Sequence, residues 1–224
     1  MVRGNTYEAL QKSHPCFGGQ ANNAGRIHLP VSPGCNIGCR FCDRAVNATE
    51  QRPGVTAKVI SPEEALIVLK KALVICPEIR VVGIAGPGDT LATDYALETF
   101  RLIREKYPQL LRCMSTNGLL LDERAQEIVE AGVDSLTVTV NAVDPDIEAR
   151  LNGFIFYHSR RYEGREAAEI LIGNQLRGIR RVAMAGVTVK VNSVLVPGVN
   201  DSHIEAVARA VSEAGASIYN ILYT

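Results

Sequence analysis

The sequence predicts an α/β protein, a partial (βα)6 barrel of the TIM type with a parallel sheet inside and helices outside. Two observations lead to this prediction. Apolar, β-branched segments alternate with amphipathic segments along the chain, and strict alternation of this kind favours a parallel sheet. The alternation occurs six times and ends on a strand, whereas a closed barrel needs eight units. We therefore expect the barrel to be open.

The expected strands are short apolar runs. In chain order they are Ile27–Val31, Arg80–Ile84, Leu111–Ser115, Ser135–Val140, Val187–Val194 and Ser217–Leu222. The expected helices are the longer amphipathic stretches between them. They are Pro62–Cys76, Tyr95–Tyr107, Asp122–Ala131, Pro145–Leu151 with Arg165–Ala185, and Ser202–Ala214.

Several of the expected helices carry boundary signals. Ser61 and Glu64 have the spacing of a capping box around a proline at the first helical position. The charges of Glu63 and Glu64 suit the start of a helix because they interact favourably with its dipole. Gly132 and Gly186 suit helix C-termini.

The length and composition of the chain predict one globular domain. The 224 residues are 46% hydrophobic and carry no formal net charge, which is enough for one sizeable core. We expect a single domain over residues 1–224, with residues 1–25 as an N-terminal extension. The scattered lysines and arginines predict no nucleic-acid partner and no membrane partner. No apolar run resembles a signal peptide or a membrane span, so we expect a cytoplasmic protein with reduced cysteines.

Three cysteines lie within eight residues, in the run Cys-Asn-Ile-Gly-Cys-Arg-Phe-Cys that contains Cys35, Cys39 and Cys42. Three thiolates in one short loop can hold three corners of a four-iron cluster and leave the fourth iron open for another ligand. A structural zinc, by contrast, needs all its positions filled. The alternative at this point is a zinc knot completed by Cys16 or His28.

Polar or glycine-rich segments lie at the ends of the expected strands. These segments are Gly83–Asp89, Cys113–Gly118, Asn141–Asp144 and, on the fifth strand, Lys190–Ser193. In a parallel barrel the carboxyl ends of the strands meet at one rim, where ligands bind. Four such segments at one rim favour a bound ligand over ordinary turns.

With Phe41 before its last cysteine, the cysteine loop resembles the signature of the radical S-adenosylmethionine (SAM) superfamily. Further segments resemble one family within it, the NifB proteins that assemble the nitrogenase cofactor. These segments are His14–Phe17, Arg26–His28, Arg52–Val55, Gly83–Asp89, Cys113–Gly118, Gly164–Glu169 and Lys190–Asp201. The resemblance covers nearly the whole chain, and it implies a partial barrel of the radical SAM type.

The resemblance also implies three groups of site residues. Cys35, Cys39 and Cys42 would be the catalytic ligands of the [4Fe-4S] cluster that binds SAM. Cys16, His28 and Cys113 would hold an additional [4Fe-4S] cluster that is substrate. The cofactor would be contacted by Phe41, Gly86, Asp89, Ser115, Asn117, Asn141, Lys190 and Asn192, of which Asp89, Asn141, Lys190 and Asn192 would orient SAM.

The implied activity is that of an enzyme, of lyase or transferase type, which builds the eight-iron, carbide-containing core of the nitrogenase cofactor (NifB-co) from two [4Fe-4S] clusters. One SAM would donate a methyl group to a cluster sulfur. A second SAM would be cleaved to a 5′-deoxyadenosyl radical that abstracts hydrogen from that methyl group. The implied partners are an iron–sulfur cluster donor, an electron donor such as a ferredoxin or flavodoxin, and a carrier or scaffold protein.

The family continues beyond the point where this sequence stops, at Asn220–Thr224. Its further segment carries a cysteine pair that helps to bind the other substrate cluster. If the sequence is complete, we expect that cluster to lack ligands, which puts assembly of the full core in doubt. If a tail is missing, that tail would supply the ligands.

Two other classes of protein stay open. Another radical SAM enzyme, acting on a peptide or small molecule, would use the cysteine loop but would not need Cys16, His28 and Cys113 around one cavity. A non-catalytic iron–sulfur carrier or zinc module would not need the polar strand ends. Taken singly, His28 is also compatible with a core histidine, and Cys16 or Cys113 with a buried free thiol. Cys76 matches no site, and we expect it in the core.

Overall fold

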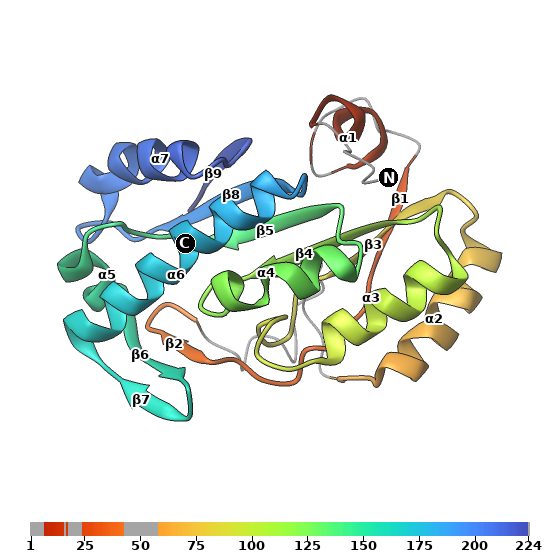
Figure 1. The fold of residues 1–224 in the computed structure, drawn as a ribbon, viewed down its shortest axis with the longest axis horizontal. Helices are drawn as coiled ribbons and strands as arrows, with labels where there is room; N and C mark the ends of the chain where they lie inside the picture. Colours follow the sequence, from red (N-terminus) through yellow and green to blue (C-terminus); the bar gives the residue numbers. More distant parts are fainter. Residues whose placement is uncertain (1–6, 16, 18–23, 43–57, 224) are drawn as a thin grey trace.

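A computed structural model describes residues 7–15, 17, 24–42 and 58–223 of the protein. The main sheet has six strands, all parallel, in the order β1, β3, β4, β5, β8 and β9. They span Gly25–His28, Ile79–Ile84, Leu111–Thr116, Ser135–Thr139, Thr188–Leu195 and Ile218–Tyr223. Among the described strands, β1 and β9 are the two edges of this sheet and do not pair with each other, so the predicted open, partial barrel is confirmed (Figure 1).

Most of the helices lie along the outer face of this sheet (Figure 1). They are α2 (Pro62–Ile75), α3 (Tyr95–Lys106), α4 (Leu121–Glu130), α5 (Pro145–Leu151), α6 (Gly164–Met184) and α7 (Ile204–Glu213), the last preceded by the short helix η2 (Asp201–His203). Neighbouring helices contact one another in the pairs α2 and α3, α3 and α4, α4 and α6, and α6 and α7. In the described part of the chain, no helix is both long enough and apolar enough to cross a membrane.

The helix boundaries follow the predicted signals. The Ser61 hydroxyl accepts from the Glu64 amide, and the Glu64 carboxylate accepts from the Ser61 amide, which completes the capping box of α2. Gly132 and Gly186, with φ of 73° and 89°, follow α4 and α6 in the left-handed conformation that glycine adopts at helix ends. The expectation that Cys76 lies in the core is wrong. It is half-buried because it lies at the C-cap of α2, beyond the last buried residue of that helix, Leu69.

Helix α1 and a second sheet are absent from the sequence prediction. Helix α1 covers Tyr7–Ser13. The second sheet is antiparallel and pairs β2 (Ile37–Cys39) with β6 (Asn152–Tyr157), and β6 with β7 (Arg160–Tyr162). Because β2 lies within the cysteine loop, this sheet connects the loop to the hairpin between α5 and α6.

The two faces of the main sheet differ because side chains alternate along each strand. The outer face carries buried apolar side chains of the core, among them Val82, Ile84, Met114, Leu136, Val138, Val189 and Val191. The alternate positions, in register across the strands, include His28, Cys113, Ser115, Ser135, Thr137, Lys190 and Asn192. Parallel sheets covered on both faces are usually apolar on both. The polar inner face therefore marks the inside of the barrel as a place for a ligand.

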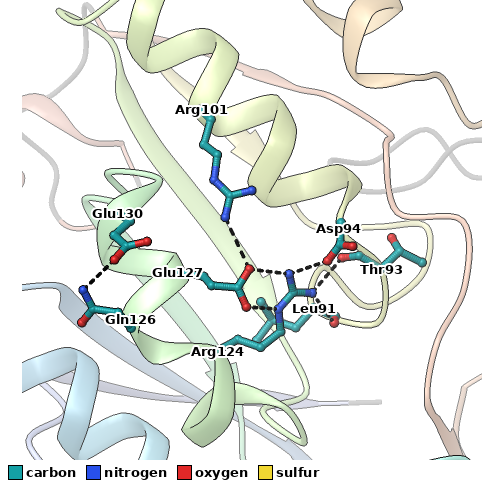
Figure 2. Close-up of polar contacts among 8 residues, drawn as sticks. All are labelled: Leu91, Thr93, Asp94, Arg101, Arg124, Gln126, Glu127 and Glu130. Carbon is teal, nitrogen blue, oxygen red and sulfur yellow. Dashed lines mark hydrogen bonds and ion pairs between the residues drawn. The ribbon is translucent and has the colours of Figure 1, made fainter.

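Arg124 on α4 connects this helix to the segment that follows β3 (Figure 2). Its guanidinium donates to the carbonyls of Leu91 and Thr93, both at 3.1 Å, and pairs with Asp94 at 2.6 Å. It also donates to both carboxylate oxygens of Glu127, at 3.1 and 3.0 Å. The Arg124 side chain is only 12% exposed. Helix α4 thus supports, from outside, the segment that leaves the rim of the barrel.

Candidate functional site

The cysteine loop follows β1 and is fastened by the second sheet. Cys39 pairs with Asn152 of β6. The aromatic ring of Phe154 lies so close to Gly38 that a Cβ at Gly38 would be 2.4 Å from a ring carbon. A side chain at position 38 would displace the Phe154 ring, so β6 packs directly against the loop between the first two cysteines.

The three loop cysteines are free thiols. Cys35 and Cys39 are half-buried, and Cys42 is exposed. Burial, and then the neighbouring Cys35 and Cys42, raise the pKa of the Cys39 thiol, because thiolates brought together in a dry site repel one another. A positively charged metal group removes this repulsion, so the donor set fits such a group.

Among the described residues, no three His, Cys, Asp or Glu side chains are arranged around one metal ion. A tetrahedral zinc brings its sulfur ligands within about 4 Å of one another. A four-iron cluster binds each thiolate through a different iron and separates the ligands more widely. Both groups are held by thiolates, so the three cysteines supply donors that suit either one.

The glycine-rich segment after β3 packs directly against the cysteine loop. Ser32 and Pro87 form a parallel β-bridge. The amide of Gly88 donates to the Ser32 carbonyl at 2.7 Å, and the amide of Asp89 donates to the Gly34 carbonyl at 2.8 Å. A Cβ at Gly88 would lie 1.9 Å from the Gly34 oxygen, so only glycine allows this approach.

Asp89 organises the rim where β3 and β4 end. Its carboxylate accepts from the Thr116 hydroxyl at 2.8 and 3.1 Å, from the Asn117 amide at 2.6 Å and from the Leu91 amide at 2.9 Å. Asp89 is 5% exposed; burial raises the pKa of its carboxyl, and these hydrogen bonds oppose that shift. Both carboxylate oxygens of Asp89 thus accept hydrogen bonds from groups of the protein. The contact of Asp89 with SAM stays a prediction.

Asn117 connects the end of β4 to the cysteine loop. Its Nδ2 lies 2.7 Å from Oδ1 of Asn36 and 3.7 Å from the Sγ of Cys35. Its Oδ1 accepts from the Leu119 amide at 2.8 Å, and its carbonyl accepts from Nε2 of Gln175 at 2.7 Å. The side chain is therefore held on both sides, with its nitrogen directed to a cysteine sulfur.

His28 and Cys113 come together inside the barrel. Both are in register with Gly83, His28 on one side and Cys113 on the other. Both ring nitrogens of His28 are buried, with no hydrogen-bond partner in the part of the chain that the structure describes. Burial, and then the charge of Arg26, lower the pKa of His28 to about 4, so the imidazole is neutral near pH 7 and has a lone pair for a metal. Cys16, predicted as the third ligand, lies outside the described residues.

Ser115 and Lys190 lie one layer nearer the rim, both in register with Thr137. The Nζ of Lys190 is 5.8 Å from the centre of the Phe17 ring, so the N-terminal extension reaches this part of the interior. Asn192 follows on the same strand, and its Oδ1 is buried with no hydrogen-bond partner among the described residues. A buried acceptor of this kind suits a bound ligand. The SAM contacts of all three stay predictions.

The other predicted cofactor contacts lie at the rim or in the loops. Asn141 is buried, and its Oδ1 accepts from the Val194 amide at 2.9 Å, which holds β8 against the end of β5. Phe41 is half-buried in the cysteine loop. A cis peptide joins Gly86 to Pro87. The contacts of Asn141, Phe41 and Gly86 with SAM stay predictions.

Sequence reasoning missed three residues that hold Asn117 and its surroundings: Asn36, Thr116 and Gln175. The positions of Asn36, beside Cys35, and of Thr116, within a polar strand end, were signals that could have found them. Gln175 gave no signal because a polar residue on a helix is usually exposed. Here it is 2% exposed.

Glu148 on α5 is a fourth residue that sequence reasoning missed. It is 1% exposed, accepts a hydrogen bond from the Asn152 side chain, and has a pKa raised to about 7 by burial. It also contributes to raising the pKa of Cys39, so it lies close to the cysteine loop. Its position in a short helix with other acidic residues gave no indication of this burial.

The comparisons with known proteins agree on one family. The chain matches the model of the radical SAM superfamily over residues 29–211. It is 48% identical over 214 residues to the FeMo cofactor biosynthesis protein NifB of Chlorobaculum tepidum, covering 94% of this chain and 50% of that protein. It is 40% identical over 225 residues to the protein of the same name from Methanocaldococcus infernus, covering 99% and 74%. The chain thus spans about half the length of the first relative and about three quarters of the second.

Solved structures share the fold at low sequence identity. Streptococcus suis SuiB bound to S-adenosylmethionine has a TM-score of 0.62 and is 13% identical, covering 89% of this chain and 39% of that chain. The structure of anSMEcpe with bound AdoMet also has a TM-score of 0.62, is 15% identical, and covers 89% and 51%. At these identities the likeness concerns the fold alone, and it supports the partial barrel.

Proposed function

Because the chain belongs to the radical SAM superfamily and, within it, to the NifB family, we propose that it is a radical SAM enzyme of FeMo cofactor biosynthesis. In this proposal it builds the eight-iron, carbide-containing core of the cofactor. The substrates would be two [4Fe-4S] clusters and two molecules of SAM, one as methyl donor and one as source of the 5′-deoxyadenosyl radical.

The juxtaposition of His28 and Cys113 inside the barrel carries the proposal. His28 offers two buried ring nitrogens that accept from and donate to no other described residue. Gly83 leaves room for its ring, and Cys113 lies in register beyond Gly83. Thiolate and neutral imidazole are both ligands of iron. A cluster that only binds SAM needs neither residue, so this pair supports a second cluster as substrate.

Cys35, Cys39 and Cys42 would hold the cluster that binds SAM. When bound there, that cluster would supply the electron for reductive cleavage of SAM. The protein would position SAM and exclude water from the site. Asp89 and Asn117 hold the glycine-rich segment and the end of β4 against the cysteine loop. The proposed SAM ligands on β8 would face the same space from the opposite side of the barrel.

The proposed partners follow from this chemistry. An iron–sulfur cluster donor would deliver the substrate clusters, and an electron donor such as a ferredoxin or flavodoxin would reduce the SAM cluster. A carrier or scaffold protein would collect the product.

The test is to reconstitute the protein without oxygen, count iron per chain and record its electron paramagnetic resonance spectrum with and without SAM. We expect iron well above the about four atoms of one cluster. His28→Ala and Cys113→Ala should each lose one signal and keep the SAM-dependent one, whereas Cys35→Ala should lose the SAM-dependent one. Cys76→Ala, at the end of α2, is the matched control and should resemble the wild type.

Two results would contradict the proposal. A single cluster that responds to SAM and is unaffected by His28→Ala would leave a radical SAM enzyme with a different substrate. Stoichiometric zinc without iron would exclude both the proposed cofactor assembly and any other radical SAM activity.

A further inference from the structure

We infer that Asn117, oriented by Asn36, donates a hydrogen bond to the Cys35 sulfur and thereby raises the reduction potential of the cluster held by the cysteine loop. The inference rests on the proposed function, because it requires a cluster at Cys35, Cys39 and Cys42. It adds a role for Asn117 that does not depend on contact with SAM.

The geometry of Asn117 suits a donor to sulfur. Its Nδ2 lies 3.7 Å from the Cys35 Sγ, a normal separation for this bond because sulfur is larger than oxygen. The same nitrogen lies 2.7 Å from Oδ1 of Asn36, and an amide nitrogen carries two hydrogens, one for each acceptor. Oδ1 of Asn117 accepts from the Leu119 amide at 2.8 Å. A flipped amide would place its NH2 group against the Leu119 N–H, so this contact fixes the nitrogen toward the sulfur.

The surroundings hold this donor in place. Asp89 accepts from the Asn117 backbone amide at 2.6 Å, and Gln175 donates to the Asn117 carbonyl at 2.7 Å. On the other side Asn36 is 8% exposed, and its carbonyl accepts from the Phe156 amide at 2.7 Å. The donor is therefore built into the rim and does not have to be ordered when a cluster binds.

The electrostatic consequence has a definite sign. Reduction adds an electron to a cluster and makes its sulfur ligands more negative. A hydrogen-bond donor stabilises the more negative state more strongly, so an N–H···S bond favours the reduced cluster. Without Asn117 as donor, the ratio of reduced to oxidised cluster at a fixed applied potential should fall by about 3-fold to 10-fold.

The experiment is a redox titration followed by electron paramagnetic resonance, without SAM, in the Cys113→Ala background, where we expect only the cluster of the cysteine loop. The variants are Asn117→Leu, which removes the donor without adding charge, and Asn117→Asp, which keeps an acceptor for the Leu119 amide but replaces the donor by a negative charge and should lower the potential further. Asn174→Leu is the matched control. Asn174 is 3% exposed and donates to the Leu119 carbonyl, but it has no contact with Cys35.

We expect both Asn117 variants to bind the cluster with a lower reduction potential, while Asn174→Leu keeps the potential of the Cys113→Ala parent. Asn36→Leu should lower the potential less, because Asn117 keeps its Leu119 contact. A loaded Asn117→Leu protein with the parent's potential would overturn this inference and leave the proposed function intact. A parent protein that binds no cluster at the cysteine loop would overturn both.

Discussion

His28 and Cys113 lie on one register line of the main sheet, two strands apart, with Gly83 between them on β3. The imidazole of His28 occupies the space above this glycine. A Cβ built on Gly83 would be 3.0 Å from the ring. The glycine therefore acts on the proposed substrate site without being able to bind a metal itself, which makes it a sensitive probe of that site.

Gly83→Ala should displace the His28 ring and lower loading of the second cluster. The SAM cluster should stay, because the cysteine loop is not touched. Iron content and the electron paramagnetic resonance signal assigned to the second cluster measure the effect. Gly173→Ala on α6 is the control, since the added methyl group meets only the end of the flexible Arg177 side chain. Full iron content in the Gly83 variant would contradict the assignment of His28 as a ligand.

Gly88→Ala should destabilise the metal-free protein by about 2 to 3 kcal/mol, a typical result of overpacking. The added Cβ would lie 1.9 Å from the backbone oxygen of Gly34, and that atom cannot rotate away. Gly34→Ala, in the same pair of loops, is the matched control because nothing lies within 4 Å of the position that its Cβ would take. Urea unfolding compares the two. Equal unfolding midpoints would show that the two loops do not pack as described.

Arg124→Met should lower the free energy of unfolding by about 1 to 3 kcal/mol, because it removes the donor to the carbonyls of Leu91 and Thr93 and the less exposed of the two arginines that contact Glu127. Arg101→Met is the comparison. Arg101 contacts the same Glu127 at 3.3 Å but is 46% exposed, and an exposed pair contributes at most about 1 kcal/mol. Thermal unfolding measures both variants. An Arg101 effect as large as the Arg124 effect would contradict this ranking.

Glu148→Gln should stabilise the protein more at pH 8 than at pH 5. Burial raises the pKa of Glu148 from 4.5 to about 7. Between these values the unfolded chain releases the proton and the folded protein keeps it, so the stability of the wild type falls as pH rises through this window and then levels off. Glutamine has no proton to release, so the difference should reach about 3 kcal/mol at pH 8 and shrink to about 1 kcal/mol at pH 5.

The measurement is chemical unfolding of wild type and Glu148→Gln across this pH range. The glutamine keeps an acceptor for the Asn152 side chain, so packing is preserved. Parallel stability profiles for the two proteins would mean that Glu148 is not held neutral by the fold.

The order and type of the main elements could be predicted because each is encoded locally. The apolar periodicity of Ile79–Ile84 and Ser135–Thr139, and the capping box at Ser61, depend only on neighbouring residues. The first strand was expected at Ile27–Val31 but ends at His28 in the structure. Leu29 still donates to the Gly83 carbonyl, and Pro30, which lacks an N–H group, cannot continue the ladder.

The β6–β7 hairpin could not be predicted from its own residues. Its turn places His158 and Ser159 at φ of 48° and 62°, a conformation usually signalled by asparagine and glycine. The strands exist because β6 finds a partner in β2, more than a hundred residues earlier in the chain. Pairing over such a distance leaves no local pattern.

The sequence by itself determined the six-unit alternation, the cysteine loop and the polar strand ends, because spacing and periodicity are local properties of the chain. Only the tertiary structure decided that His28 faces Cys113 across Gly83, and that Asn117 directs its amide to the Cys35 sulfur. These relationships depend on strand register and on loops meeting at one rim. They join residues far apart in the chain, and the free energy that fixes them comes from the packing of the whole barrel.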